Sequence, residues 1–76
     1  MSTDISDSVR RALNRYFRDL DGQQPHAIYD MVIRAVEKPM LEVIMKQANG
    51  NQSAAAEILG INRNTLRRKL TDYELL

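Results

Sequence analysis

GNQSAAAEILGINRNTLRRKL, residues 50–70, is the stretch that decides the fold. It opens on Asn51, a favourable helix N-cap, followed by small and apolar residues that favour a short helix over residues 52–59. Gly60 permits the positive φ that a tight turn requires, and Asn62 can cap another helix directly behind it. Two helices joined by so short a turn predict a helix-turn-helix, in which the first helix supports the second.

The second helix of this motif combines a buried face with a basic face. Leu66, Leu70 and Tyr73 recur at steps of three or four residues, so they predict the buried face. Residues 49–70 contain four basic side chains against one acidic side chain, whereas residues 1–48 contain seven of each. A basic helix directly after a tight turn is typical of a surface that binds the phosphates of DNA.

Position on the motif suggests a role for each candidate side chain. Asn62 and Arg63 lie at the tip of the second helix and are candidates for reading base edges, because Arg pairs well with guanine and Asn with adenine. The other candidates suit phosphate contacts, which take the larger share of most DNA interfaces. The predicted DNA-binding set is Asn51, Ser53, Asn62, Arg63, Asn64, Thr65, Arg67, Arg68 and Lys69.

Two longer helices are predicted before this motif. The first begins near Ile5, with Asp4 or Ser6 as its N-cap, and ends at Asp21-Gly22; its apolar residues are Ile5, Val9, Ala12, Leu13, Tyr16, Phe17 and Leu20. The second runs from about Ala27 to Ala48 and ends at Asn49-Gly50. Pro39 lies inside the second helix, and we expect a kink there rather than a break because the apolar pattern continues beyond it.

The apolar stripes of these two helices are too broad for the helices to cover each other. A two-fold dimer with an intertwined four-helix core is the simplest solution, and the alternative is a monomer whose last two helices cover both stripes. The predicted dimer core is Val9, Leu13, Phe17, Ile28, Val32, Val36, Met40, Val43 and Ile44. The predicted fold is thus all-α, one compact domain with dimerisation helices in residues 1–49 and a DNA-binding helix-turn-helix in residues 50–76.

The composition argues against several other classes of protein. A chain of 76 residues permits one domain with a small core, and the lack of cysteine excludes disulfides and zinc–thiolate sites. No apolar run is long enough to span a membrane, and no phosphate-binding glycine loop or metal-ligand cluster is present. The single histidine, His26, has no nearby catalytic partner and is interpreted as a surface loop residue. We expect no enzymatic activity, no cofactor, no small-molecule ligand and no membrane partner.

Residues 50–70 resemble the signature GNQ…A…LGINR-x-TLRKKL of the Fis family, the factor for inversion stimulation of bacterial nucleoids. DSVRRALNRYF at residues 7–17 and the E-x-PML run at residues 37–41 extend the resemblance to about residues 5–76. It implies an all-helical homodimer in the bacterial cytoplasm that binds double-stranded DNA of degenerate sequence, bends it and regulates transcription. It also implies that Asn62 and Arg63 lie nearest the bases, and that the remaining candidates contact DNA or its phosphates.

Three departures from the family pattern qualify this resemblance. Few residues precede the first helix, so the mobile arm by which enterobacterial members activate DNA invertases is not expected. Ala54 stands where some members have a basic residue, and Thr71, Asp72 and Glu74 replace an end that can be lysine-rich, so the salt dependence of DNA binding should be shallower. Two other functions also fit the sequence: the DNA-binding output domain of a larger enhancer-binding response regulator, and a module whose basic helix binds an acidic protein.

Overall fold

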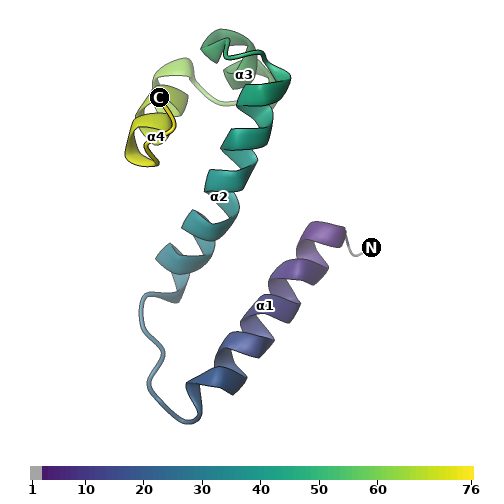
Figure 1. Cartoon of the computed structure of the whole chain (residues 1–76), viewed down its shortest axis with the longest axis vertical. Helices are drawn as coiled ribbons and strands as arrows, with labels where there is room; N and C mark the ends of the chain where they lie inside the picture. The colour runs from purple at the N-terminus through teal and green to yellow at the C-terminus, as the bar shows by residue number, and fades with distance from the viewer. Residues whose placement is uncertain (1–2) are drawn as a thin grey trace. The chain divides into compact units, whose positions relative to one another are not determined.

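The computed structural model describes residues 3–76, which form four helices and no strand (Figure 1). α1 spans Asp4–Leu20, α2 spans Ile28–Gln47, α3 spans Gln52–Leu59 and α4 spans Arg63–Asp72. The all-α class and the order of the helices predicted from the sequence are therefore confirmed.

The chain divides into two compact units, and the boundary falls inside α2, after Val32. The second unit, Ile33–Leu76, contains most of α2 together with α3 and α4. The sequence had suggested a functional boundary between residues 49 and 50. The compact units group the chain differently, because the later part of α2 supplies apolar side chains to the same core as α3 and α4.

In the first unit, α1 begins one residue earlier than predicted. Thr3 is its N-cap, and the Thr3 side chain accepts a hydrogen bond from the backbone N–H of Ser6 at 3.0 Å. The prediction of Asp4 or Ser6 as the cap was wrong, because both residues already belong to the first turn, where Asp4 favours the positive end of the helix dipole. Asp21 ends the helix in the left-handed conformation, with φ of 50°. No residue of α1 is buried in the single chain.

α2 continues through Pro39, so the predicted absence of a break is confirmed, and the kink at this residue stays a prediction. Proline has no N–H to donate, so the helix lacks one backbone hydrogen bond at this point. Its C-terminal end follows the predicted pattern: Asn49 and Gly50 both have positive φ, and the Gly50 N–H donates to the carbonyl of Met45 at 3.0 Å. This bond satisfies a carbonyl that the end of the helix would otherwise leave without a partner.

The second unit has a small core to which α2, α3 and α4 all contribute. Leu41, Leu66 and Leu70 are its largest fully buried side chains. The other buried members are Ala48, Ala55, Ala56 and Tyr73, and Ile44, Met45, Ala54, Leu59, Ile61 and Leu75 pack around them. The predicted burial of the Leu66, Leu70 and Tyr73 face is confirmed, whereas Leu41 was missing from the predicted stripe of α2.

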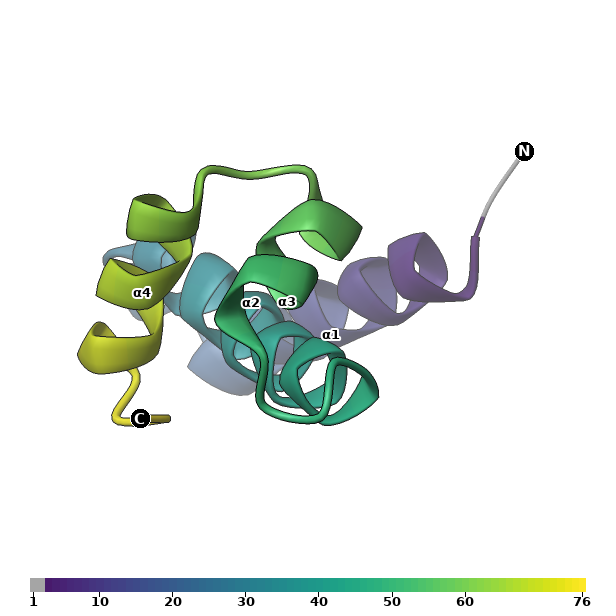
Figure 2. The same ribbon diagram turned by 90° about the horizontal axis from the view of Figure 1, so that it is seen from above.

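Small residues and one glycine allow α3 and α4 to meet closely. Ala55 and Ala56 are buried on α3, and Gly60 ends that helix with φ of 75° and an N–H that donates to the carbonyl of Ala56 at 2.8 Å. Ile61 follows and packs against the core. Figure 2 shows the two helices beside each other and joined by this turn, which is the helix-turn-helix order that the sequence predicted.

Replacing Leu41 by Ala tests the core that attaches the helix-turn-helix to α2. We expect the free energy of unfolding in urea to fall by roughly 2–5 kcal/mol, because the change leaves a cavity at a fully buried position. Glu42→Ala is the matched control, since Glu42 is the exposed neighbour of Leu41 on the same helix. Equal losses of stability in the two variants would contradict this description of the core.

Candidate nucleic-acid interface

The N-terminal tip of α4 is exposed and is held in place by its own cap. The Asn62 side chain accepts a hydrogen bond from the backbone N–H of Asn64 at 2.7 Å, as its predicted role as N-cap requires. Asn62, Arg63 and Asn64 are all exposed. The free N–H groups and the positive end of the helix dipole make this tip suitable for a negatively charged partner.

The rest of α4 separates buried from exposed residues as the sequence predicted. Leu66 and Leu70 are fully buried, while Arg67 and Arg68 are exposed. Thr65 lies between these faces and is half-buried. The two arginines are thus presented to solvent by a helix whose opposite side is fixed in the core.

The start of α3 contributes the remaining two candidates. Asn51 is its N-cap, and the Asn51 side-chain oxygen accepts a hydrogen bond from the Ala54 N–H at 3.0 Å. The amide group of Asn51 and the hydroxyl of Ser53 are exposed and can still donate hydrogen bonds. The structure therefore exposes eight of the nine predicted DNA-binding residues wholly or in part without engaging them in an ion pair.

Lys69, the ninth, is paired inside the protein. Its Nζ lies 2.7 Å from Oε2 of Glu37, in an ion pair between α4 and α2. The hydroxyl of Tyr73 donates to the other carboxylate oxygen of Glu37 at 2.6 Å. The guanidinium of Arg34, one turn before Glu37 on α2, lies 5.0 Å from the centre of the Tyr73 ring, a cation–π distance.

These four side chains fix how α4 is oriented on α2. Lys69 on α4 and Tyr73, the C-cap of that helix, are four residues apart and lie on one side, and Glu37 binds both with its two oxygens. Sequence reasoning did not identify Glu37 or Arg34 as part of the site. The signal was weak: a Glu and a Tyr 36 residues apart, each compatible with a solvent-exposed position. The one feature that separates Glu37 from an ordinary solvent-exposed glutamate is its position beside the PML run, on the side of α2 that also carries Leu41.

The network also changes the acidity of two of its members. The hydrogen bond from Lys69, followed by that from Tyr73, lowers the pKa of the Glu37 carboxyl below its ordinary value of 4.5, although burial acts in the opposite direction. The same bond to Glu37 raises the pKa of the Tyr73 hydroxyl above 10.0, because a phenolate would face a carboxylate. Glu37 is therefore ionised and Tyr73 neutral over the whole physiological range.

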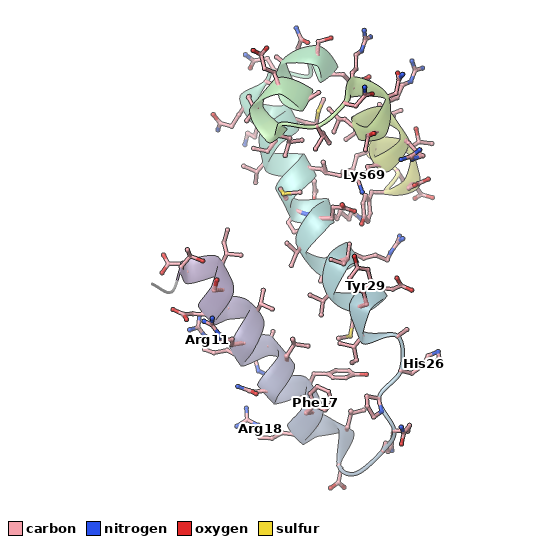
Figure 3. The ribbon with its side chains drawn as sticks, turned by 180° about the vertical axis from the view of Figure 1, so that it is seen from behind. Arg11, Phe17, Arg18, His26, Tyr29 and Lys69 are labelled. Carbon is pink, nitrogen blue, oxygen red and sulfur yellow. The ribbon has the colours of Figure 1, made fainter. Side chains whose placement is uncertain are left out.

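Within residues 3–76 no group of three or more His, Cys, Asp or Glu side chains is arranged to hold a metal ion. None of the helices described is long and apolar enough to cross a membrane. His26 is exposed in the segment between α1 and α2, as the sequence suggested (Figure 3).

The fold and the candidate site together define a small all-helical protein with a helix-turn-helix at its C-terminal end. The chain belongs to the Fis family. Residues 32–73 match the family described as bacterial regulatory protein, Fis family, and residues 3–25 match the N-terminal domain of DNA-binding protein Fis. The resemblance noted in the sequence is thereby confirmed.

Three relatives illustrate how far the similarity extends. A protein of Ralstonia nicotianae is 54% identical over 72 residues, which cover 95% of this chain and 94% of the relative. A protein of Neisseria meningitidis serogroup A is 53% identical over 73 residues, with 96% and 92% covered. A protein of Pseudomonas aeruginosa is 50% identical over 72 residues, with 95% and 69% covered. All three are named for their likeness to Fis, as Fis-like DNA-binding proteins.

The lowered pKa of Glu37 predicts a pH-dependent contribution to stability. A carboxyl whose pKa is lowered in the folded state stabilises that state above its ordinary pKa of 4.5, and this contribution is lost as the pH falls through the folded pKa. We expect Glu37→Gln to melt at a lower temperature than the parent near pH 7, and this difference to narrow as the pH falls below about 4. Melting followed by circular dichroism across this range is the measurement.

Glu42→Gln is the control for this experiment, because Glu42 lies on the same helix, is exposed and makes no ion pair among the described residues. Its melting temperature should follow that of the parent at every pH. If Glu37→Gln also followed the parent, Glu37 would contribute nothing to holding α4.

Proposed function

We propose that this protein is a homodimeric regulator of transcription that binds and bends double-stranded DNA in the bacterial nucleoid, without enzymatic activity. The observation that carries the proposal is α4: an exposed, capped tip with Arg63, followed by Arg67 on the flank of the helix and Arg68 opposite the buried leucines, both exposed. A helix held in this way can enter the major groove with its tip and its outer face. The membership of the chain in the Fis family and the DNA-binding names of its relatives support the same function.

The exposure of the candidate side chains supports a division of roles along α4. Asn62 and Arg63 approach base edges, where an arginine can bind guanine through two hydrogen bonds. Thr65, Arg67 and Arg68 follow along the helix and bind phosphates, and Asn64 lies beside them at the tip. Asn51 and Ser53, at the start of α3, donate hydrogen bonds to a neighbouring phosphate.

Lys69 can serve as a phosphate contact only in competition with Glu37. The side chain of Lys69 is 33% exposed, and its ammonium group already lies at ion-pair distance from a carboxylate. A phosphate would have to replace that carboxylate or share the ammonium group with it. The phosphate role proposed for Lys69 is therefore less direct than that of Arg67 or Arg68, which have no ion pair in the described residues.

A dimer is supported by the apolar residues that the single chain leaves exposed. At about 100° per residue, Val36, Met40 and Val43 lie on one side of α2, about 130° from the side where Leu41 and its neighbours meet α3 and α4. All three are exposed, Val43 by 57%. A helix that is apolar on two sides requires a partner on each, and a second copy of the chain supplies the second partner.

The remaining members of the predicted dimer core are consistent with this proposal. Phe17 on α1 is 50% exposed in the single chain, and Val9, Leu13, Ile28 and Val32 are only partly buried. Ile44 differs from them, because it already packs against the core of the single chain. A chain of this size gains much from covering such residues, because it buries little apolar surface by itself. The family resemblance further supports two α4 helices held closer than the roughly 34 Å between successive major grooves, so that the DNA must bend.

Arginine substitutions on α4 test the DNA-binding function. We expect Arg67→Ala or Arg68→Ala to lower the affinity for all DNA sequences. Each should also reduce the salt slope, which is the steepness with which the logarithm of the affinity falls with the logarithm of the salt concentration, by about 0.9 for each phosphate that the protein no longer neutralises. Arg63→Ala should in addition narrow the difference between preferred and random DNA, because it removes a base contact. Gel-shift titrations at several salt concentrations measure both effects.

Arg10→Ala is the control, since Arg10 lies on α1 and forms an ion pair with Asp7 at 3.0 Å. It should bind DNA like the parent. If the three α4 variants also bound like the parent, α4 would not be the DNA-binding helix, and an acidic protein partner would become the better explanation of its charge.

Substitutions of exposed apolar residues test the dimer. We expect Val43→Asp to convert the protein to a monomer at micromolar concentration, because a carboxylate cannot be buried at the proposed interface without a large cost. Its DNA affinity should fall as well, since two linked sites bind far more tightly than one. Sedimentation and gel shifts on the same samples measure the two effects.

Ile58→Asp is the matched control, because Ile58 on α3 is exposed by 56%, almost as much as Val43, but lies outside the proposed interface. It should sediment like the parent. A folded parent that sediments as a monomer at the same concentration would overturn the dimer.

A further inference from the structure

Three arginines of α1 form a line that the helix-turn-helix does not use. Arg11, Arg15 and Arg18 are separated by four and three residues, so at about 100° per residue they lie within about 60° around the helix axis. We call these three residues the arginine stripe. All three are exposed. Figure 3 shows Arg11 and Arg18 leaving the same side of α1, with Phe17 on another side.

The arginine stripe is not neutralised by acidic side chains in residues 3–76. The two ion pairs of this part of the chain are Arg10–Asp7 and Lys69–Glu37, and neither includes a residue of the stripe. Asp19, four residues after Arg15, makes no ion pair with it. Arg11 donates only to the hydroxyl of Ser8, at 3.3 Å. Three guanidinium groups therefore remain available on one side of a regular helix.

We propose that the arginine stripe is a second DNA-binding surface, which binds the sugar–phosphate backbone of double-stranded DNA independently of α4. This inference rests on the DNA-binding function proposed above, because that function places DNA beside the protein. The chemistry fits, since the planar guanidinium group binds phosphate through two parallel hydrogen bonds.

The dimensions of the stripe also fit a DNA backbone. Seven residues separate Arg11 from Arg18, which corresponds to about 10.5 Å along the helix at 1.5 Å per residue. The phosphates of one DNA strand recur about every 3.4 Å along the duplex axis, so the stripe spans about three of them. Contacts to phosphates carry no information about the base sequence, so the arginine stripe should bind DNA without sequence preference.

Neutralising the arginine stripe tests this proposal. In the variant R11Q/R15Q/R18Q the helix should persist, because Gln favours helices about as strongly as Arg and the three side chains are exposed. We expect its salt slope for binding to fall by up to about 0.9 for each arginine in contact with a phosphate. Far-ultraviolet circular dichroism confirms that α1 remains helical in the sample used.

A control variant with the same net charge as the stripe variant distinguishes a direct contact between the stripe and DNA from a general effect of net charge. R10Q/Q23E/Q24E also lowers the net charge by three, and it alters exposed positions outside the arginine stripe. We expect its salt slope to remain close to that of the parent. If the stripe variant and this control lost affinity and slope to the same extent, the stripe would not be a binding surface.

Two DNA lengths show which part of the DNA the arginine stripe contacts. On a short duplex that covers only the site of the helix-turn-helix, a lower slope for the stripe variant places the contact next to that site. If the stripe variant has a lower salt slope than the parent only on linear DNA of plasmid length, the arginine stripe contacts a distant segment of the same DNA molecule. Either result supports the proposal, and equal slopes for parent and stripe variant on both DNAs overturn it.

Failure of this inference is distinguishable from failure of the proposed function. If the parent bound neither DNA, both would fall. If the parent bound DNA and lost affinity with R67A/R68A, while the stripe variant matched the parent, only the arginine stripe would be rejected. If the stripe variant bound DNA like the parent but lost binding to phosphatidylserine vesicles or to an acidic protein, that result would also reject DNA as the partner of the arginine stripe.

Discussion

The burial of Leu66 and Leu70 is the constraint on which the rest of the candidate site depends. Both side chains are fully buried beside Leu41, Ala55 and Ala56, in a core to which three helices contribute. α4 has only ten residues, too few to form a stable helix alone in water. Its helical state and its orientation therefore both derive from this packing. Because the leucines occupy one face, Arg67 and Arg68 are necessarily presented on the other.

A hydrophobic contact alone leaves a short helix free to rotate or slide, and the polar contacts with Glu37 restrict that freedom. Lys69 and Tyr73 bind its two oxygens from successive turns of α4, at 2.7 and 2.6 Å. Hydrogen bonds to an ionised group are directional and stronger than those between neutral groups. The basic face of α4 thus contributes one of its four cations to the position of the helix, and the other three form no ion pair within residues 3–76.

The helix-turn-helix was predictable from the sequence because each of its signals is local. Asn51 and Asn62 are caps within three residues of the groups they bind, and Gly60 is required by the φ of a single position. The prediction of α2 was less complete. The buried residues predicted on this helix were all assigned to the dimer core: Ile28, Val32, Val36, Met40, Val43 and Ile44. Leu41 was left out, although it is fully buried within the single chain, and Ile44 packs beside it.

The reason is that periodicity identifies a face but not what covers it. α2 is apolar on two sides, and a single sequence does not tell which side meets the same chain. The pairing of Glu37 with Lys69 and Tyr73 was not predictable for a related reason. It joins residues more than 30 positions apart, and both α2 and α4 had to be placed before the pairing became visible.

The number of free cations limits how a single copy of this chain can act. Three arginines on α4 can neutralise about three phosphates, which gives weak binding at physiological salt. In the proposed dimer, two copies joined through the exposed side of α2 would double that number and make the second binding event intramolecular. The two sides of α2 would then have separate functions: the side with Leu41 orients α4 within one chain, and the side with Val43 sets the distance between two such helices. On this view affinity depends on the first side, whereas the shape that the DNA must adopt depends on the second.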